Sequence, residues 1–314
     1  MQLSQSEVSR NQRIHLPLTA RADVELWLKR EDELHPLISG NKYRKLKYNL
    51  SAAKAEKAHT LITFGGAHSN HILATAAAAS EHGFKSVGII RGEELSSKIA
   101  ENPTLSHAQS LGMKFIFVTR ERYRELTRNP EKARAICHES GQYLIPEGGS
   151  NSLAVKGVSE LLLPEDIRAD YICVSVGTGA TLAGIVEGAQ PSQKVRGYAA
   201  LAHHELEAEV ARFTDKEHFK IIRDYVFGGY AKTTPELISQ MNTFYRQTGV
   251  LLDPVYTGKL IFGVLNDIRR GAFEKGSVIL TIHTGGLQGI DAMNARLERS
   301  GEEQIQRLCS KKVS

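Results

Sequence analysis

Residues 60–90 read TLITFGGAHSNHILATAAAASEHGFKSVGII, and they indicate the class of fold. Thr60 to Phe64 is a short run of β-branched and apolar residues, which is typical of a buried strand. Asn70 to His82 is an alanine-rich stretch that ends at Gly83, as a helix with a glycine C-cap would. Ser86 to Ile90 is a second apolar run. The stretch therefore predicts a strand, a helix and a second strand, the repeating unit of a parallel sheet.

The same alternation continues along the chain. We expect further strands at 114–118, 143–145, 171–176, 195–201 and 278–282, and helices at 103–111, 121–140, 181–188, 234–248, 258–269 and 287–298. Such alternation predicts an α/β protein with helices on both faces of parallel sheets. Ligands bind at the carboxyl ends of parallel strands, so the loops after Phe64, Val176 and Ile282 are the expected site.

Composition narrows the class of protein. With 41% hydrophobic and 24% charged residues, the chain has an ordinary globular balance. The net charge of +5 comes from dispersed basic residues, so we expect no nucleic-acid partner. No apolar stretch is long enough for a membrane span or a signal sequence, which favours the cytoplasm and no membrane partner. The three cysteines are odd in number and far apart, which fits neither a disulfide framework nor a zinc site.

Residues 39–48, SGNKYRKLKY, place Lys42 where a loop becomes a helix. Asn41 is a plausible N-cap, and an apolar stripe follows at helical spacing, namely Tyr43, Leu46, Leu50 and Ala53. Partial burial near Arg44 and Lys45 would disfavour the ammonium form of Lys42 and free its amine for a Schiff base. The alternative is a solvated lysine in the first helical turn.

The loop at 64–71, FGGAHSNH, leads from a strand into a helix. Ser69 and Asn70 would face a ligand at the helix N-terminus, where a carboxylate fits. The alternative is a tight turn in which one of these two residues is only the helix cap. His68 and His71 are spaced as a metal pair but lack a third ligand, so we expect no metal.

The loop at 176–184, VGTGATLAG, has the glycines and hydroxyls that grip a phosphate dianion. A nucleotide is the alternative ligand, although the loop lacks the Lys-Ser/Thr of a P-loop. Residues 252–259, LDPVYTGK, and 283–286, HTGG, would lie at the same edge of the sheet. Tyr256 is either a site residue or an ordinary core tyrosine.

These motifs together resemble the pyridoxal 5′-phosphate (PLP)-dependent family of 1-aminocyclopropane-1-carboxylate (ACC) deaminases and D-cysteine desulfhydrases, among the fold type II enzymes. The resemblance runs from 28–32, LKRED, to 283–286, and GNKYRKL and DPVYTGK are specific to it. It implies a large domain of residues 1–38 plus 146–314 and a small inserted domain of residues 39–145. The cofactor would lie in the cleft between them, and the enzyme would be a homodimer acting on a small amino acid.

The resemblance also implies residue roles. Lys42 would hold PLP covalently and later move the substrate α-proton, with Ser69 beside the reacting carbon. The phosphate would be bound by Gly177, Thr178, Gly179, Ala180 and Thr181. The substrate carboxylate and the cofactor ring would be held by the loop that includes His68, Ser69, Asn70 and His71. Tyr256 and Tyr230 would flank the substrate.

Thr257 would meet the pyridine nitrogen, where ACC deaminases carry a glutamate. A neutral hydroxyl makes the ring a weaker electron sink, which suits expulsion of a good β-leaving group better than opening of a cyclopropane. We therefore expect α,β-elimination from D-cysteine or a related amino acid. The alternatives are ACC deamination, another β-substituted substrate, or a PLP-binding protein without activity. Ser39 and His68 depart from the family pattern, and the chain is shorter between Lys98 and Tyr143, so the substrate is open.

Overall fold

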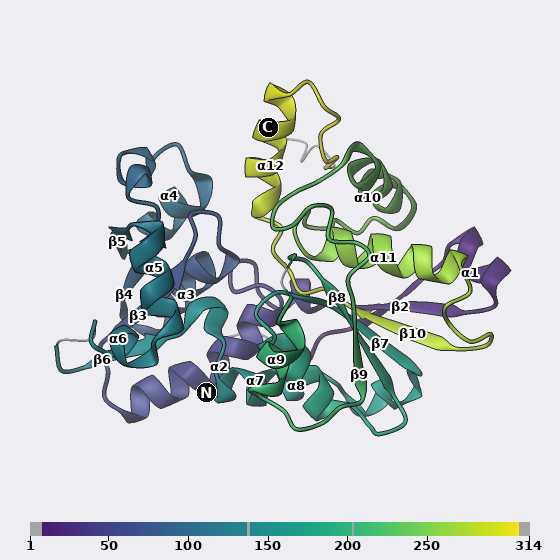
Figure 1. The fold of residues 1–314 in the computed structure, drawn as a ribbon, viewed down its shortest axis with the longest axis horizontal. Helices are drawn as coiled ribbons and strands as arrows, with labels where there is room; N and C mark the ends of the chain where they lie inside the picture. Colours follow the sequence, from purple (N-terminus) through teal and green to yellow (C-terminus); the bar gives the residue numbers. More distant parts are fainter. Residues whose placement is uncertain (1–7, 137–138, 203, 308–314) are drawn as a thin grey trace, which may run out of the picture.

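The computed structural model describes residues 8–136, 139–202 and 204–307, and two sheets organise it (Figure 1). The larger sheet has six strands in the order β1-β2-β10-β7-β8-β9. Their bounds are β1 Asn11–Ile14, β2 Glu25–Lys29, β7 Tyr171–Val176, β8 Lys194–Ala199, β9 Phe219–Ile222 and β10 Val278–Ile282. Every pairing in it is parallel except that of β1 with β2.

The smaller sheet has four strands in the order β5-β4-β3-β6, all parallel. Their bounds are β3 Thr60–Gly65, β4 Lys85–Arg91, β5 Met113–Val118 and β6 Gln142–Ile145. The prediction of an α/β fold with two parallel sheets is confirmed. Three strands of the larger sheet were not predicted, namely β1, β2 and β9.

Helices cover both faces of the larger sheet because its strands are apolar on both sides. In β7, Tyr171 and Cys173 pack with one hydrophobic cluster, and Ile172 and Val174 pack with another. The first face carries α1 Pro17–Ala22, α10 Pro235–Thr248, α11 Thr257–Arg269 and α12 Gly289–Arg299; the second carries α7 Ser152–Ser159, α8 Ala180–Gly188 and α9 Leu206–Ala211. Figure 1 shows α10 and α11 on one side of the strands and α8 and α9 on the other.

The smaller sheet is covered in the same way. Leu61 of β3 packs with helices on one face, and Ile62 packs with helices on the other. The first face carries α2 Asn41–Ala55, α3 Asn70–His82 and α4 Pro103–Ser110; the second carries α5 Arg120–Arg128 and α6 Pro130–Arg134. The predicted apolar stripe of α2 is fully buried, at Tyr43, Leu46, Leu50 and Ala53.

One predicted helix, 121–140, is wrong. Two short helices, α5 and α6, replace its first part, and they meet at Asn129, which is extended (φ −118°, ψ 102°). The cause is local, because a residue before a proline avoids the helical region. Residues 137–138, where the prediction continued, lie outside the described residues. Among the described helices, none is long and apolar enough to cross a membrane.

Candidate active site

Both sheets contain a point where the strand order reverses, and the loops there define the candidate site. β3 is followed in sequence by β4 on one side and has β6 on the other; β7 is followed by β8 and has β10 on its other side. Ligands in open α/β sheets bind beyond the carboxyl ends of strands at such points. The four loops that follow β3, β6, β7 and β10 are therefore the expected place.

The N-terminus of α2 packs against the loop after β10. Gly40 has φ +64°, and a Cβ there would lie 1.9 Å from the Thr284 carbonyl oxygen, so glycine is required. Asn41 N–H donates to that same oxygen (3.3 Å). The prediction that Asn41 is the N-cap is wrong, because Gly40 occupies that position. The Asn41 side chain instead donates to Thr181 Oγ1 (2.9 Å) on α8.

Lys42 reaches the loop after β6. Its Nζ donates to the Gly148 carbonyl oxygen (3.0 Å), and Lys45 Nζ donates to the same oxygen (3.0 Å). Burial lowers the pKa of Lys42 from 10.5 to about 8, against the opposing charge of Glu147. Burial, followed by the Lys42 charge, lowers the pKa of Lys45 well below its usual value. The site thus holds a lysine with an unusually accessible neutral amine.

We expected Arg44 to help free the Lys42 amine, but Arg44 is paired with a carboxylate instead. Its Nε and Nη2 donate to the two carboxylate oxygens of Glu31, each at 2.9 Å, in a pair that is buried on both sides. The Glu31 carboxylate neutralises the guanidinium. Burial rather than Arg44 therefore accounts for the lowered pKa of Lys42.

The loop after β3 ends at α3. Ser69 is the N-cap, and its Oγ accepts from His71 N–H (3.2 Å), as the alternative interpretation of this loop anticipated. Asn70 Oδ1 accepts from Gln288 Nε2, and a Cβ on Gly286 would lie 2.3 Å from Asn70 Nδ2. Asn70 is thus held against the loop after β10.

The two histidines of this loop point in different directions. His68 is exposed, with its ring 3.3 Å from Asn102 Nδ2. His71 is buried, and its Nε2 lies 2.8 Å from Thr63 Oγ1. Burial lowers the pKa of His71 well below its usual value, with the charges of Lys42 and Lys45 adding to the effect. Within the described residues, no group of three metal-ligating side chains is present.

The loop after β7 brings glycines and hydroxyls to the start of α8. Gly179 has φ +81° and precedes Ala180, the first helical residue. Thr178 is exposed, and its Oγ1 lies 2.6 Å from Ser150 Oγ of the loop after β6. Thr181 lies in the first turn. The first N–H groups of a helix lack intrahelical acceptors, so this end of α8 offers several donors to an anion.

Tyr256 lies beside this loop. A Cβ on Gly177 would be 3.2 Å from the Tyr256 ring, so the two expected site residues are in contact. The Tyr230 ring meets it edge-on, with centroids 6.5 Å apart and planes at 65°. Burial raises the pKa of Tyr256 well above its usual value, aided by the charges of Tyr230, Asp253 and Glu147. Burial also raises the pKa of Tyr230, so both tyrosines are neutral at ordinary pH.

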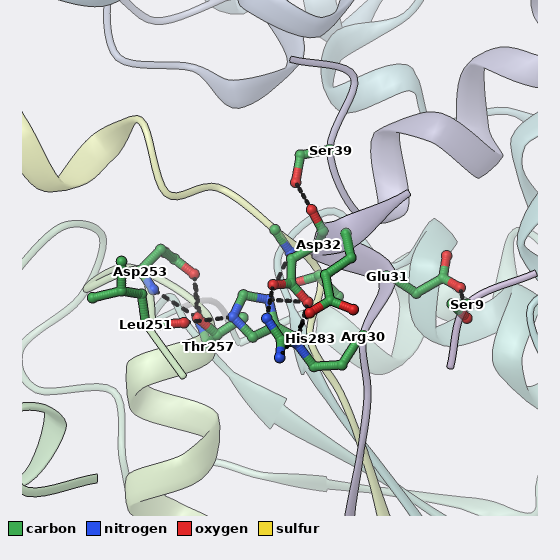
Figure 2. A network of polar contacts seen from close by, with 12 residues as sticks. Ser9, Arg30, Glu31, Asp32, Ser39, Leu251, Asp253, Thr257 and His283 are labelled. Atoms are coloured by element: carbon green, nitrogen blue, oxygen red, sulfur yellow. Dashed lines mark hydrogen bonds and ion pairs between the residues drawn. The ribbon is translucent and has the colours of Figure 1, made fainter. Parts of the chain in front are cut away.

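Thr257, the first residue of α11, is buried and bonded to Asp253 (Figure 2). Its hydroxyl donates to Asp253 Oδ2 (2.7 Å) and accepts from Asp253 N–H (2.8 Å). Burial raises the pKa of Asp253, while its hydrogen-bond donors act in the opposite direction. The Thr257 proton is thus already committed to a carboxylate within the chain.

His283 links the loop after β10 to the segment that carries Asp253 (Figure 2). Its Nδ1 lies 3.2 Å from Gly285 N–H, which donates to it, so Nε2 carries the ring proton and donates to the Leu251 carbonyl oxygen (2.7 Å). Asp32 Oδ1 lies 3.5 Å from Nδ1. The imidazole thereby fixes Leu251, two residues before Asp253.

The sequence analysis missed the loop after β6. Gly148 is the acceptor that Lys42 and Lys45 share, and Glu147 accepts from the Tyr123 hydroxyl (2.7 Å). A signal was present, since 147–150, EGGS, follows the predicted strand 143–145 after a single proline. Glycines at the carboxyl end of a parallel strand mark the same kind of position as the other three loops.

With the site geometry established, comparisons identify the family. A model described as a pyridoxal-phosphate dependent enzyme matches residues 10–285. The chain belongs to this family. It is 34% identical over 296 residues, covering 85% of this chain and 73% of that protein, to the mitochondrial bifunctional D-cysteine desulfhydrase/1-aminocyclopropane-1-carboxylate deaminase of Arabidopsis thaliana.

Other relatives in the family carry one or the other name. A putative 1-aminocyclopropane-1-carboxylate deaminase of Pyrococcus furiosus is 32% identical, covering 85% of this chain and 86% of that one. A D-cysteine desulfhydrase of Klebsiella pneumoniae (strain 342) is 29% identical, covering 87% and 90%. The crystal structure of an ACC deaminase homologue has a TM-score of 0.78 at 27% identity and covers 94% of each chain. The fold type II architecture is thereby confirmed.

The cofactor of this family is pyridoxal 5′-phosphate, and the residues of the site fit it. A PLP enzyme needs an amine that loses its proton more readily than an ordinary lysine, and burial lowers the pKa of Lys42 from 10.5 to about 8. It also needs donors for a phosphate dianion, and the start of α8 supplies N–H groups beside Thr178 and Thr181. The Asn41 to Thr181 hydrogen bond joins these two parts directly.

Proposed function

We propose that this enzyme catalyses α,β-elimination on a small amino acid, with D-cysteine as the substrate. D-Cysteine and water would give pyruvate, ammonia and hydrogen sulfide. Relatives from two kingdoms that bear the name D-cysteine desulfhydrase support this reaction. When bound, PLP supplies an electron sink for the carbanion that remains after the α-proton is lost.

Thr257 is the observation that carries the choice of reaction. Its hydroxyl is neutral, and its proton is given to the buried Asp253 carboxylate (2.7 Å). At the place where the resemblance implies contact with the pyridine nitrogen, the chain therefore offers a neutral hydroxyl whose proton is already hydrogen-bonded. A weaker electron sink favours a substrate whose own Cβ–S bond breaks as the α-proton leaves. Opening a cyclopropane ring offers no such leaving group.

The remaining roles follow from the geometry and are part of the proposal. Lys42 would hold the cofactor and carry the α-proton on Nζ. The start of α8, from Gly177 to Thr181, would bind the phosphate. Ser69 and Asn70, at the N-terminus of α3, would receive the substrate carboxylate. Tyr256 and Tyr230 would flank the substrate on the opposite side.

The two histidines assigned to the substrate differ in how well the geometry supports them. His68 is exposed, with its ring 3.3 Å from Asn102 Nδ2, so it would be accessible to a substrate side chain. His71 is buried behind the loop, against Thr63. We therefore propose that His71 acts by shaping the loop and that His68 is the histidine with an influence on substrate choice.

ACC deamination is the second candidate, because a relative that is 32% identical is named a putative ACC deaminase. We further propose the division into a large domain, residues 1–38 plus 146–314, and a small one, residues 39–145. The two sheets support it, since each lies wholly in one of these parts. A homodimer and a cytoplasmic location complete the proposal; both rest on the family resemblance and on composition.

The test compares substrates on the purified enzyme. Release of pyruvate or 2-oxobutyrate is measured with D-cysteine, β-chloro-D-alanine, L-cysteine and ACC, while the visible spectrum is recorded. We expect turnover of the two D-amino acids to exceed that of ACC by far. Borohydride reduction and peptide mapping should find the pyridoxyl group on Lys42, and the Lys42→Ala variant should lose both the label and the activity.

The controls separate the cofactor assignment from the substrate assignment. A label on Lys45 would overturn the role of Lys42 and leave the reaction open. ACC turnover equal to or above that of D-cysteine would overturn the reaction and leave Lys42 in place. Inactivity on all four substrates, with a normal spectrum, would refute D-cysteine as the substrate.

A further inference from the structure

Lys259 is a buried lysine of α11 that the reaction does not use. Its side chain is 1% exposed, and its Nζ lies within hydrogen-bond distance of three backbone carbonyl oxygens. These belong to Ala200 (3.0 Å), Val226 (2.9 Å) and Gly229 (2.6 Å). An ammonium group has three hydrogens to donate, so all three are used. The site is complete without a carboxylate.

Two of these carbonyls belong to a loop with unusual backbone geometry, residues 226–231. Four of its six residues have positive φ, namely Phe227 (50°), Gly228 (81°), Gly229 (120°) and Ala231 (53°). Phe227 and Ala231 carry a Cβ, which makes this region unfavourable for them. Such a backbone persists only where surrounding contacts hold it.

The loop carries Tyr230, which is 44% exposed and therefore gains little fixation from packing. The carbonyl immediately before it, that of Gly229, makes the shortest bond to Lys259. Tyr256 is the N-cap of α11, and Lys259 follows it by three residues, in the first turn of that helix. The start of α11 thus carries both Tyr256 and Lys259, and Lys259 holds the loop on which Tyr230 lies.

We propose that Lys259 is a positioning residue, whose ammonium group fixes the loop 226–231 and so sets Tyr230 against Tyr256. The inference rests on the proposed role of the two tyrosines at the substrate. Their edge-on contact, with centroids 6.5 Å apart, is the geometry that Lys259 maintains.

The protonation state of Lys259 agrees with this role. Burial lowers its pKa to about 8, while the charge of Asp253 acts in the opposite direction. At neutral pH the group therefore remains mostly an ammonium with three donors. Arg296 of α12 donates to the Ala231 carbonyl oxygen (2.9 Å) at the other end of the loop. That contact is exposed, which makes it the weaker of the two.

The three hydrogen bonds from Lys259 to backbone carbonyls are here called the tether. Hydrogen exchange tests whether this tether holds the loop, without relying on activity. In the unmodified holoenzyme, the backbone amides of a peptide that spans residues 226–231 should exchange more slowly than those of an ordinary surface loop. In Lys259→Met, which keeps the length and loses every donor, that peptide should exchange faster by tenfold or more, while peptides of β3 should not change. The matched control is Lys216→Met, which removes another lysine-to-carbonyl bond, that to Glu187 (2.9 Å).

Kinetics then test whether the tether acts through Tyr230. We expect Lys259→Met to lower kcat/KM by roughly ten- to a hundredfold, because a small misplacement of a site residue has such effects. In a Tyr230→Ala background the same change should have almost no further effect. Lys259→Arg, which retains the charge, should recover part of both the exchange protection and the activity.

The outcomes are distinguishable. Full additivity of the Lys259 and Tyr230 changes would show that Lys259 does not act through Tyr230 and would overturn the inference. So would rapid exchange of residues 226–231 in the unmodified enzyme, a result that needs no folded variant. Exchange that behaves as expected in an enzyme that is inactive on D-cysteine would instead contradict the proposed substrate and leave the tether intact.

Discussion

Replacing Glu147 with Gln should lower the pKa of the Lys42 amine below its value of about 8. The Glu147 charge is what opposes burial, so removing it leaves burial unopposed. Gln has nearly the same shape, and its amide oxygen can still accept from the Tyr123 hydroxyl, which lies 2.7 Å from Glu147 Oε1. The variant therefore changes charge while leaving the local contacts in place.

The size of the existing effect sets the scale. A fall in the pKa of Lys42 from 10.5 to about 8 corresponds to roughly 3 kcal/mol against the ammonium form. At pH 7 it raises the neutral fraction of the amine from about 0.03% to about 9%, roughly 300-fold. Any further fall in the Glu147→Gln variant increases that fraction again. The amine should then react faster at neutral pH.

Competitive labelling measures the pKa directly. The cofactor-free enzyme is treated with trace acetic anhydride at a series of pH values, alongside a free amine as internal standard. Tandem mass spectrometry separates acetylation at Lys42 from acetylation at Lys45. We expect the Lys42 midpoint near 8 in the unmodified enzyme and at lower pH in Glu147→Gln.

A matched control is Glu125→Gln, which removes an exposed carboxylate that pairs with Arg122 and Lys132. Its Lys42 midpoint should not move. A midpoint near 10.5 in the unmodified enzyme would refute the claim that burial frees the amine. A midpoint that rises in Glu147→Gln would refute the sign of the Glu147 contribution.

Three further results are expected. Thr181→Val removes a hydroxyl worth about 1.5–3 kcal/mol to a dianion, so PLP affinity measured by fluorescence titration should fall about tenfold or more; unchanged affinity would remove Thr181 from the phosphate site. Gly40→Ala places a Cβ at φ +64° and 1.9 Å from the Thr284 oxygen, whereas Gly83→Ala (φ +73°) meets nothing within 4 Å. In urea, Gly40→Ala should cost well over the roughly 1 kcal/mol expected of Gly83→Ala, and equal costs would contradict the close approach. Because the folded pKa of Lys42 is depressed to about 8, the unfolded chain binds the extra proton between pH 8 and 10.5. The stability advantage of Lys42→Met over the cofactor-free parent should therefore be constant below pH 8 and disappear as pH rises to 10.5, and a constant difference would contradict the shift.

The strands and helices were predictable where one local signal was sufficient. β3, α3 and β4 follow from an apolar run, an alanine-rich stretch and Gly83, and none of these depends on distant residues. Helix 121–140 failed because the break at Asn129 was outweighed by favourable residues on either side. The antiparallel β1 could not be foreseen, since Asn11 to Ile14 acquires its strand character only by pairing with β2.

In the candidate site, too, local features were predictable from the sequence and contacts between distant residues were not. The sequence placed Lys42 at the start of a helix, because the pattern that follows it is local. It could not show that Asn41 reaches Thr181, 140 residues away, instead of capping its own helix. Nor could it show that Lys42 and Lys45 share the Gly148 carbonyl, because that contact depends on how two sheets are placed. The individual residue roles remain proposals.

The position of β10 constrains how the molecule is made. β10 lies between β2 and β7, yet among the strands in the described part of the chain it is the last to be synthesised. All four strands of the smaller sheet have been synthesised once residue 145 has emerged from the ribosome. In the larger sheet, β2 and β7 each keep one unpaired edge until β10, which begins at residue 278, has been synthesised. The Thr284 carbonyl that receives Asn41 N–H follows directly after β10. A nascent chain therefore has Lys42 early but brings the loops of the candidate site together only after the loop that follows β10 has been synthesised.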